Sequence, residues 1–186
     1  MKTTEARGED QLTESDEHNT SPVGGVANLA SDELLALAAQ QPFFKGMSEH
    51  LIQLLADSIM EMRFKSGHWL FQQGDPANRF YLILEGKVVI ESEVKELGMV
   101  PIRTLGPGDD LAWAWLFPPY RMHFSARAIE PTRAIFFYGT RLRERCEINH
   151  ELGYQLMKRV AEVVVRNLNA TQQRLMEFTH ASDLKS

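Results

Sequence analysis

The stretch FQQGDPANRFYLILEGKVVIE, residues 71–91, contains two runs of strand-like sequence separated by a glycine. Residues 80–84 and 87–91 each alternate two sets of side chains with a period of two, which is typical of β-strands. Gly86 lies between the runs, and Gln73, Gly74 and Asp75 precede them as a second turn. The stretch therefore predicts consecutive antiparallel strands joined by tight turns.

The same pattern continues outward in both directions between about Ile59 and Tyr138. Turn signals recur about every 8 to 12 residues, which favours a small all-β sandwich or barrel. The segment VKELGMVPIR, residues 94–103, predicts a hairpin with Gly98 in its turn. We expect a returning segment over residues 123–129 and a final strand over residues 133–138. The predicted fold is mainly β with flanking helices: an antiparallel, jelly-roll-like β-roll.

Helices are predicted on both sides of the β-roll. Ser31 is the expected N-cap of a first helix, and a second helix follows Ser48. After the strands, a short helix is expected over residues 141–148 and a long one over residues 151–178. The long helix carries apolar residues at steps of three and four: Leu152, Leu156, Val160, Val163, Val164, Leu168, Thr171, Leu175 and Phe178. At about 1.5 Å per residue it is about 40 Å long, more than the β-roll alone can cover.

These signals divide the chain into four parts. Residues 1–28 are polar and mostly acidic and are predicted to form a disordered tail. Residues 29–140 form the β-roll with its N-terminal helices, and residues 141–180 form the C-terminal helices. Residues 181–186 are a short tail.

Composition excludes several classes of protein. The 186 residues carry a formal net charge of −5, so no overall positive field attracts nucleic acid or an anionic membrane. The single cysteine, Cys146, cannot form an intramolecular disulfide. No apolar run reaches the roughly 18 to 20 residues that span a bilayer, and no signal sequence is recognisable. We therefore expect a cytoplasmic protein with no direct contact to nucleic acid or membrane.

A second stretch, LGPGDDLAWAWLFPPYRMHFSARAI at residues 105–129, bears on function. Gly106 and Gly108 flank Pro107 and allow a tight turn out of a strand. Trp113 and Trp115 follow within a few residues. Because they are two apart, an extended or loop conformation would point both indoles the same way, whereas a helix would separate them.

From Pro42 to about Phe137 the chain resembles the cyclic-nucleotide-binding domain family, the effector domain of catabolite activator-like proteins. The resemblance implies a phosphate-binding cassette that continues into glycine, glutamate, a small residue and an arginine. In the family, the glutamate accepts the ribose hydroxyl and the arginine pairs with the cyclic phosphate. Those places align with Ala112, Trp113, Trp115 and Met122, so the resemblance implies a retained pocket without its usual contacts.

The candidate ligand-binding residues are Ala112, Trp113, Ala114, Trp115, Arg121, Met122, His123, Ser125 and Arg127. Two readings of the tryptophans stay open. They can stack on a cyclic nucleotide or another small aromatic ligand, or they can fill the volume of a nucleotide and leave a ligand-free domain. Arg121 precedes Met122 by one residue and, in an extended segment, faces the opposite way, so it replaces the missing arginine only if the loop bulges.

The resemblance also implies a partner for the long helix. In bacterial regulators of the family, the matching helix forms a two-fold seam, which predicts a homodimer here through Leu156, Val160, Val163, Val164 and Leu168. Packing on its own β-roll alone is the alternative. Those regulators continue into a helix-turn-helix, whereas this sequence ends at Ser186, so we expect no direct DNA contact.

No catalytic constellation is recognisable, so we predict no enzymatic activity, no metal site and no resident cofactor. His68 and His123 lack the spacing of a metal-binding cupin, and haem held by His123 or Cys146 is disfavoured. Two functions remain. The first is a sensor domain that binds a small ligand and signals through its C-terminal helix. The second is a degenerate, ligand-free domain that dimerises and docks on a protein partner.

Overall fold

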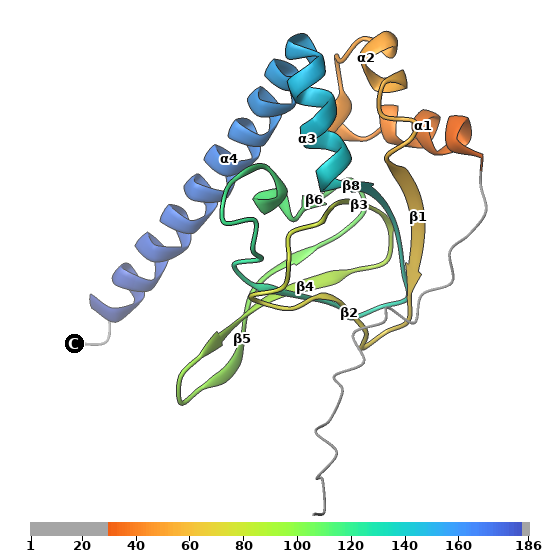
Figure 1. Cartoon of the computed structure of the whole chain (residues 1–186). Helices are drawn as coiled ribbons and strands as arrows, with labels where there is room; N and C mark the ends of the chain where they lie inside the picture. The colour runs from red at the N-terminus through yellow and green to blue at the C-terminus, as the bar shows by residue number, and fades with distance from the viewer. Residues whose placement is uncertain (1–29, 184–186) are drawn as a thin grey trace, which may run out of the picture.

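The computed structural model describes residues 30–183 and shows two four-stranded antiparallel sheets that close into a β-roll (Figure 1). One sheet has the order β1-β8-β3-β6 and the other β2-β7-β4-β5. The strands are β1 Ile59–Phe64, β2 Trp69–Phe71, β3 Arg79–Glu85, β4 Val88–Val94, β5 Gly98–Leu105, β6 Asp110–Leu111, β7 Ser125–Ala128 and β8 Thr132–Tyr138. The predicted antiparallel β-roll is confirmed.

Helices gather at one end of the β-roll, and the long helix α4 runs past it (Figure 1). They are α1 Ser31–Ala39, η1 Pro42–Phe44, α2 Glu49–Gln53, η2 Trp113–Leu116, α3 Gly139–Ile148 and α4 His150–Asp183. The predicted cap at Ser31 is wrong: the N-cap of α1 is Ala30, and no side chain caps that end. The carbonyl of Ala30 accepts the first helical N–H groups instead, those of Glu33 and Leu34.

The turn between β3 and β4 explains why Gly86 is glycine. Its φ is +83°, and a Cβ at this position would lie 2.2 Å from the carbonyl oxygen of Pro131. The predicted hairpin over residues 94–103 is present as β4 and β5, with Val94 opposite Gly98. Its turn consists of residues 95–97, so Gly98 begins β5 and does not lie within the turn.

Two apolar cores lie on opposite faces of the sheet that contains β3. Phe80 and Leu82 point to the helices, where they pack with residues of α1, α2, α3 and α4. Tyr81 and Ile83 point into the β-roll. This division explains the unbroken apolar run in residues 80–84, because both faces of the strand are buried.

The first half of α4 belongs to the core between the β3 sheet and the helices, the helix-side core. Leu152, Leu156, Val160 and Val163 are all buried there. Beyond Val163, every described side chain of α4 is exposed except that of Asn167, which is half-buried. Among the described helices, none combines the length and hydropathy needed to cross a membrane.

Candidate ligand cassette and its contacts with the C-terminal helix

The turn before the cassette is held to β3 by backbone and side-chain hydrogen bonds. Gly108 N–H donates to the carbonyl of Ile83 at 2.9 Å, and Ile83 N–H donates to the carbonyl of Asp109 at 3.0 Å. The Asp109 carboxylate accepts the N–H of Gly106 at 2.9 Å. The turn is therefore rigidly placed at the end of β5, as the glycine-proline-glycine sequence predicts.

Ala112 keeps a backbone conformation that favours glycine. Its φ is +71°, and it is the residue that opens η2. A residue with a Cβ loses about 1–2 kcal/mol in this left-handed region. Ala112 is nevertheless buried in the core of the β-roll. The path of the cassette backbone is thus retained at the place where the family resemblance implies glycine.

The helix η2 sends the two tryptophans in different directions, so the helical one of the two arrangements considered above is present. In a 3₁₀ helix, residues two apart are about 240° apart around the axis. Trp115 is fully buried in the helix-side core, with its ring centroid 6.4 Å from that of Phe80. Trp113 is half-buried at the surface of the cassette, 6.2 Å from Phe117 and 6.0 Å from His123 between ring centroids.

Trp115 is built into the junction of η2 with α3. Its carbonyl oxygen accepts a hydrogen bond from Arg143 at 2.6 Å. A Cβ at Gly139 would lie 2.8 Å from the Cβ of Trp115, so only glycine fits at the start of α3. The indole Nε1 of Trp115 is buried and has no hydrogen-bond partner within residues 30–183. Trp115 therefore joins the cassette to the helices and does not fill the β-roll.

Inside the β-roll, the place aligned with the family's arginine is occupied by an apolar side chain. Met122 is buried there together with Ala112 and Ala114. Its N–H donates to the carbonyl of Asp75 at 2.9 Å, and its carbonyl accepts the N–H of Gly74 at 2.8 Å. A buried thioether cannot form a charge-assisted pair with a phosphate.

The candidate cations around the cassette already have protein acceptors. Arg121 is exposed and donates to the carbonyl of Gly74 at 3.1 Å. Arg127 donates twice to Glu91, at 3.0 and 2.6 Å, and covers the ring of Trp69. These paired guanidinium groups are not placed as free anion clamps.

The other two candidate residues lie apart from each other. His123 is exposed beside Trp113. Ser125 is buried, and its hydroxyl accepts the N–H of Gln73 at 2.9 Å. The nine candidate residues therefore divide between several environments. Ala112, Ala114 and Met122 lie inside the β-roll, Trp113 and His123 lie together at the surface, and Trp115 lies in the helix-side core.

Polar contacts between the cassette and α4 were missed by the sequence analysis. Arg166 of α4 donates to the Asp110 carboxylate at 3.0 Å, and Arg103 of β5 donates to the side-chain oxygen of Asn167. Arg103 also lies 3.5 Å from the Asp109 carboxylate. Burial raises the pKa of Asp110, and Arg166 opposes that rise. The paired aspartates after Gly108 were the available signal, but Arg166, the partner of Asp110, is 56 residues away in sequence.

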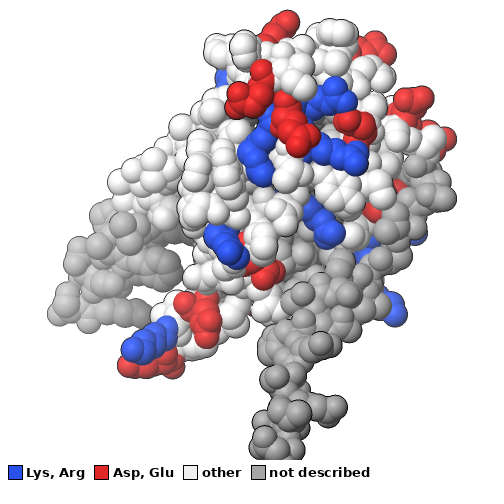
Figure 2. All heavy atoms as spheres, viewed as in Figure 1, with Lys and Arg blue, Asp and Glu red and all other residues white. Residues whose placement is uncertain are grey.

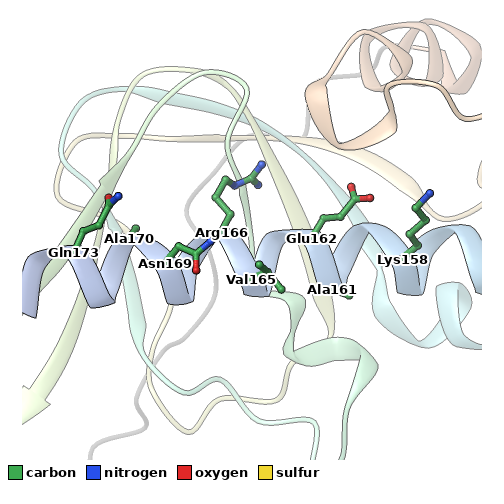
Figure 3. A pocket seen from close by; sticks show the side chains of 8 residues that line it. All are labelled: Lys158, Ala161, Glu162, Val165, Arg166, Asn169, Ala170 and Gln173. Atoms are coloured by element: carbon green, nitrogen blue, oxygen red, sulfur yellow. The ribbon is translucent and has the colours of Figure 1, made fainter.

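The outer side of α4 is apolar and exposed, which corrects the predicted seam. Leu156, Val160 and Val163 pack in their own domain, and only Val164 and Leu168 of the five predicted residues are exposed. A groove of about 760 Å³ also runs along α4. Figure 3 shows Lys158, Glu162 and Arg166 projecting from one side of the helix there, and Val165 and Ala161 from the other.

Ion pairs also lie elsewhere on the surface. In Figure 2, basic and acidic side chains lie next to one another on the face shown, without a broad positive area among the coloured residues. The ion pair of Arg145 with Asp57 is one example. Within residues 30–183, no group of three His, Cys, Asp or Glu side chains is arranged to hold a metal ion. Burial raises the pKa of the Cys146 thiol to about 11, so this thiol is protonated at neutral pH.

Comparison with known proteins agrees with this architecture. Residues 61–149 match the family model described as the cyclic nucleotide-binding domain. The chain is 29% identical over 147 residues to a CRP-like cAMP-activated global transcriptional regulator of Mycobacterium tuberculosis, covering 79% of this chain. It spans only 62% of that relative's length.

Two further matches support the same class. A crystal structure described provisionally as a cyclic nucleotide-binding protein from Geobacter metallireducens GS-15 has a TM-score of 0.65 and 28% identity, covering 76% of this chain and 99% of the other. The cAMP-dependent protein kinase regulatory subunit of Dictyostelium discoideum is 49% identical over 39 residues, which are 21% of this chain and 12% of that protein. Two of these three relatives are described as regulatory proteins, and the third as a cyclic nucleotide-binding protein.

Proposed function

We propose that this chain is a regulatory module of the cyclic nucleotide-binding class that acts as a two-fold dimer through α4. The observation that carries the proposal is an exposed apolar stripe on α4, made by Met157, Ala161, Val164 and Leu168. Of these, Met157, Val164 and Leu168 are 46%, 36% and 55% exposed. A contiguous exposed apolar surface is typical of an interaction site, because the solvent-facing side of a helix is ordinarily polar.

The spacing of the stripe fits a coiled coil. Its positions follow one another at steps of four, three and four residues, the repeat of a heptad seam. Thr171 continues the series, and Leu175 does so in sequence, although its side chain lies outside the described residues. This stripe lies on a different side of α4 from the buried Leu156, Val160 and Val163, so α4 can pack on its own domain and on a partner helix at once.

A second copy of this chain is the occupant that the flanking residues fit. In the heptad notation abcdefg, Ala161 and Leu168 occupy position a, and Val164 and Thr171 occupy position d. In a parallel pair of helices, the residue just before an a position faces the residue just after the next d position of the other helix. Asn167 then faces Gln172, and this pairing places no like charges together. Val165 adds exposed apolar surface beside the seam.

The cassette supports a function that does not depend on the family's usual ligand contacts. Met122 buries an apolar side chain at the place of the phosphate-binding arginine, and Arg121 and Arg127 have acceptors within the protein. We propose that the module transmits a signal through α4 and docks on a protein partner, within the cytoplasm and without direct contact to nucleic acid.

Sedimentation equilibrium tests the dimer. We expect the full chain to sediment at about twice its mass of 21.2 kDa. Leu168→Glu, which places a charge in the stripe, should give a folded monomer. Asn169→Glu is the matched control, because Asn169 is the exposed neighbour outside the stripe. A chain that remains monomeric at high micromolar concentration, or an unchanged dimer in Leu168→Glu, would contradict the proposal.

A small-molecule sensor is the second candidate, and Trp113 favours it. This indole is half-buried beside Phe117 and His123 and therefore offers an aromatic surface at the mouth of the cassette. A thermal-shift panel of cyclic nucleotides and small aromatic compounds, read together with tryptophan fluorescence, tests this function. A ligand that raises the unfolding temperature of the parent but not of Trp113→Ala would support it.

A further inference from the structure

The loop that follows η2 carries aromatic side chains at the surface of the molecule. Phe117 and Tyr120 are 40% and 36% exposed, and Trp113 is half-buried. The ring centroid of Trp113 lies 6.2 Å from that of Phe117 and 6.0 Å from that of the exposed His123. The N–H of Tyr120 donates to the carbonyl of Phe117 at 2.9 Å, so both belong to one turn. These rings therefore lie together outside the β-roll.

Two arginines border the rings without a carboxylate partner in the described part of the chain. The guanidinium of Arg143 in α3 lies 4.3 Å from the ring centroid of Tyr120 and donates to the carbonyl of Trp115. Arg121 follows Tyr120 in the chain and donates to the carbonyl of Gly74. A carbonyl carries no net charge, and a guanidinium has five N–H donors. Both positive charges are therefore fixed in place and not neutralised.

The surface is locally positive, although the whole chain has a net charge of −5. Residues 112–129 contain two arginines, one histidine and no acidic residue. Asp75 bonds to the neighbouring Met122 through its carbonyl, but its carboxylate accepts the N–H of Gln72 at 2.8 Å. Two cations are enough to attract a short acidic segment, whereas a polyanion such as nucleic acid is repelled by the net charge of the whole chain.

The loop is also preorganised for binding a protein segment. Tryptophan, tyrosine and arginine are the side chains that contribute most to protein–protein hot spots. The loop that carries them here is held by the N–H of Ala77, which donates to the carbonyl of Tyr120 at 2.8 Å, and by the backbone bonds of Met122. A loop that is already fixed loses little conformational entropy when a partner binds.

We propose that this aromatic–arginine surface binds an acidic segment of a partner protein, with an apolar side chain among its carboxylates. The surface consists of Trp113, Phe117, Tyr120, Arg121, His123 and Arg143. The apolar side chain packs on the exposed rings, and the carboxylates accept charge-assisted hydrogen bonds from the two guanidinium groups. This surface deepens the proposed docking function and rests on it, because it states where the partner binds and what its chemistry is.

Fluorescence anisotropy with the full chain tests the surface. The probe is a short fluorescein-labelled peptide of Asp and Glu with a central leucine, and the control peptide has Asn and Gln in place of the acids. Only the acidic peptide should bind, and its affinity should fall as the salt concentration rises. Trp113→Ala should weaken binding by at least about tenfold. Arg121→Gln should weaken it about two- to fivefold, whereas Arg121→Lys, which keeps the charge, should retain most of the affinity.

Arg145→Gln is the matched control, because it removes a positive charge from the same helix as Arg143, but one that already pairs with Asp57. It should leave binding unchanged. Arg143→Gln should weaken binding as Arg121→Gln does. Circular dichroism reports on the fold of every variant. If the lost bond to Trp115 loosens the cassette in Arg143→Gln, Arg121→Gln decides, because Arg121 is exposed and outside both cores.

Equal binding of the two peptides, no binding of either, or an equal effect of Arg145→Gln and Arg121→Gln would overturn the proposed surface. Binding that appears only after the acidic residues within positions 5–17 are replaced by Asn and Gln would also overturn it, since that segment of the same chain would then be the occupant. Vesicles of phosphatidylserine and phosphatidylcholine that bind the parent but not Arg121→Gln, without peptide binding, would assign the surface to a membrane instead.

Sedimentation of the same samples separates this surface from the dimer. A monomer that binds the acidic peptide contradicts the dimer alone. A dimer that does not bind the peptide contradicts the aromatic–arginine surface alone.

Discussion

Met122 and Arg121 are neighbours in the chain and face opposite ways. The Met122 side chain is buried inside the β-roll, and the Arg121 guanidinium lies outside and donates to the carbonyl of Gly74. The loop is fixed in this orientation because the backbone N–H and carbonyl of Met122 both bond to residues 74 and 75. Arg121 therefore cannot take the place of the phosphate-binding arginine unless this loop is rebuilt.

This relationship predicts weak or undetectable binding of cyclic mononucleotides. The contacts to ribose and phosphate that the family resemblance implies are both missing, and each such charge-assisted contact is worth about 1.5–3 kcal/mol. Together they lower the affinity by about two to four decades. Titration calorimetry with cAMP and cGMP should show no binding at low micromolar concentration. A clear isotherm in that range would contradict the prediction, and its loss in Arg121→Gln would assign the contact to Arg121.

Val163 and Val164 are a matched pair that separates the domain core from the proposed seam. Val163 is buried in its own domain, whereas Val164 is partly exposed on the stripe. Val163→Glu places an unpaired charge in the core and should unfold or strongly destabilise the monomer. Val164→Glu should leave the domain folded and split the dimer. Circular dichroism and sedimentation of both variants check this, and the reverse pattern would contradict the assignment of the two faces.

The two tryptophans of η2 should differ in their effect on stability. Trp115 is fully buried, so Trp115→Ala should lower the free energy of unfolding by about 3–5 kcal/mol. Trp113 is half-buried, and Trp113→Ala should lower it much less. Urea denaturation measures both values. Acrylamide should quench more of the emission in Trp115→Phe, which keeps Trp113, than in Trp113→Phe; equal quenching would contradict the difference in burial.

The pKa of the Glu61 carboxyl group leads to a prediction of how the free energy of unfolding changes with pH. Its side chain is fully buried, and hydrogen bonds from Arg133 hold its pKa below the ordinary value of 4.5, despite the opposing effect of burial. An acid with a lowered pKa in the folded state contributes stability above its unfolded pKa, and the contribution is lost as pH falls through the folded pKa.

Stability should therefore fall as the pH drops below about 4.5, and Glu61→Gln should reduce this dependence. Urea midpoints of the parent and Glu61→Gln between pH 3 and pH 7 provide the measurement. Glu85→Gln is the control, because Glu85 contacts the same Arg133 from an exposed position. An acid dependence that is the same in the parent and Glu61→Gln would show that Glu61 does not carry it.

The β-roll was predictable because its signals are local. Alternation in residues 80–91 and the turn at Gly86 depend only on neighbouring residues and on the clash that a Cβ would make. The cap at Ser31 was mispredicted because a serine before an apolar helix is a frequent but dispensable cap, and Ala30 supplies the first carbonyl here.

The sequence by itself determined the antiparallel strands, their glycine turns and the apolar, helical C-terminus, because each follows from a period or a backbone restriction within a few residues. Only the tertiary structure decided which apolar residues of α4 meet their own domain, where Trp115 points and which groups meet Asp110. A helical period shows that Val163 and Val164 are apolar, but not which of them is covered. That choice depends on the position of β5, β6 and η2, which are brought to α4 by contacts between residues far apart in the chain.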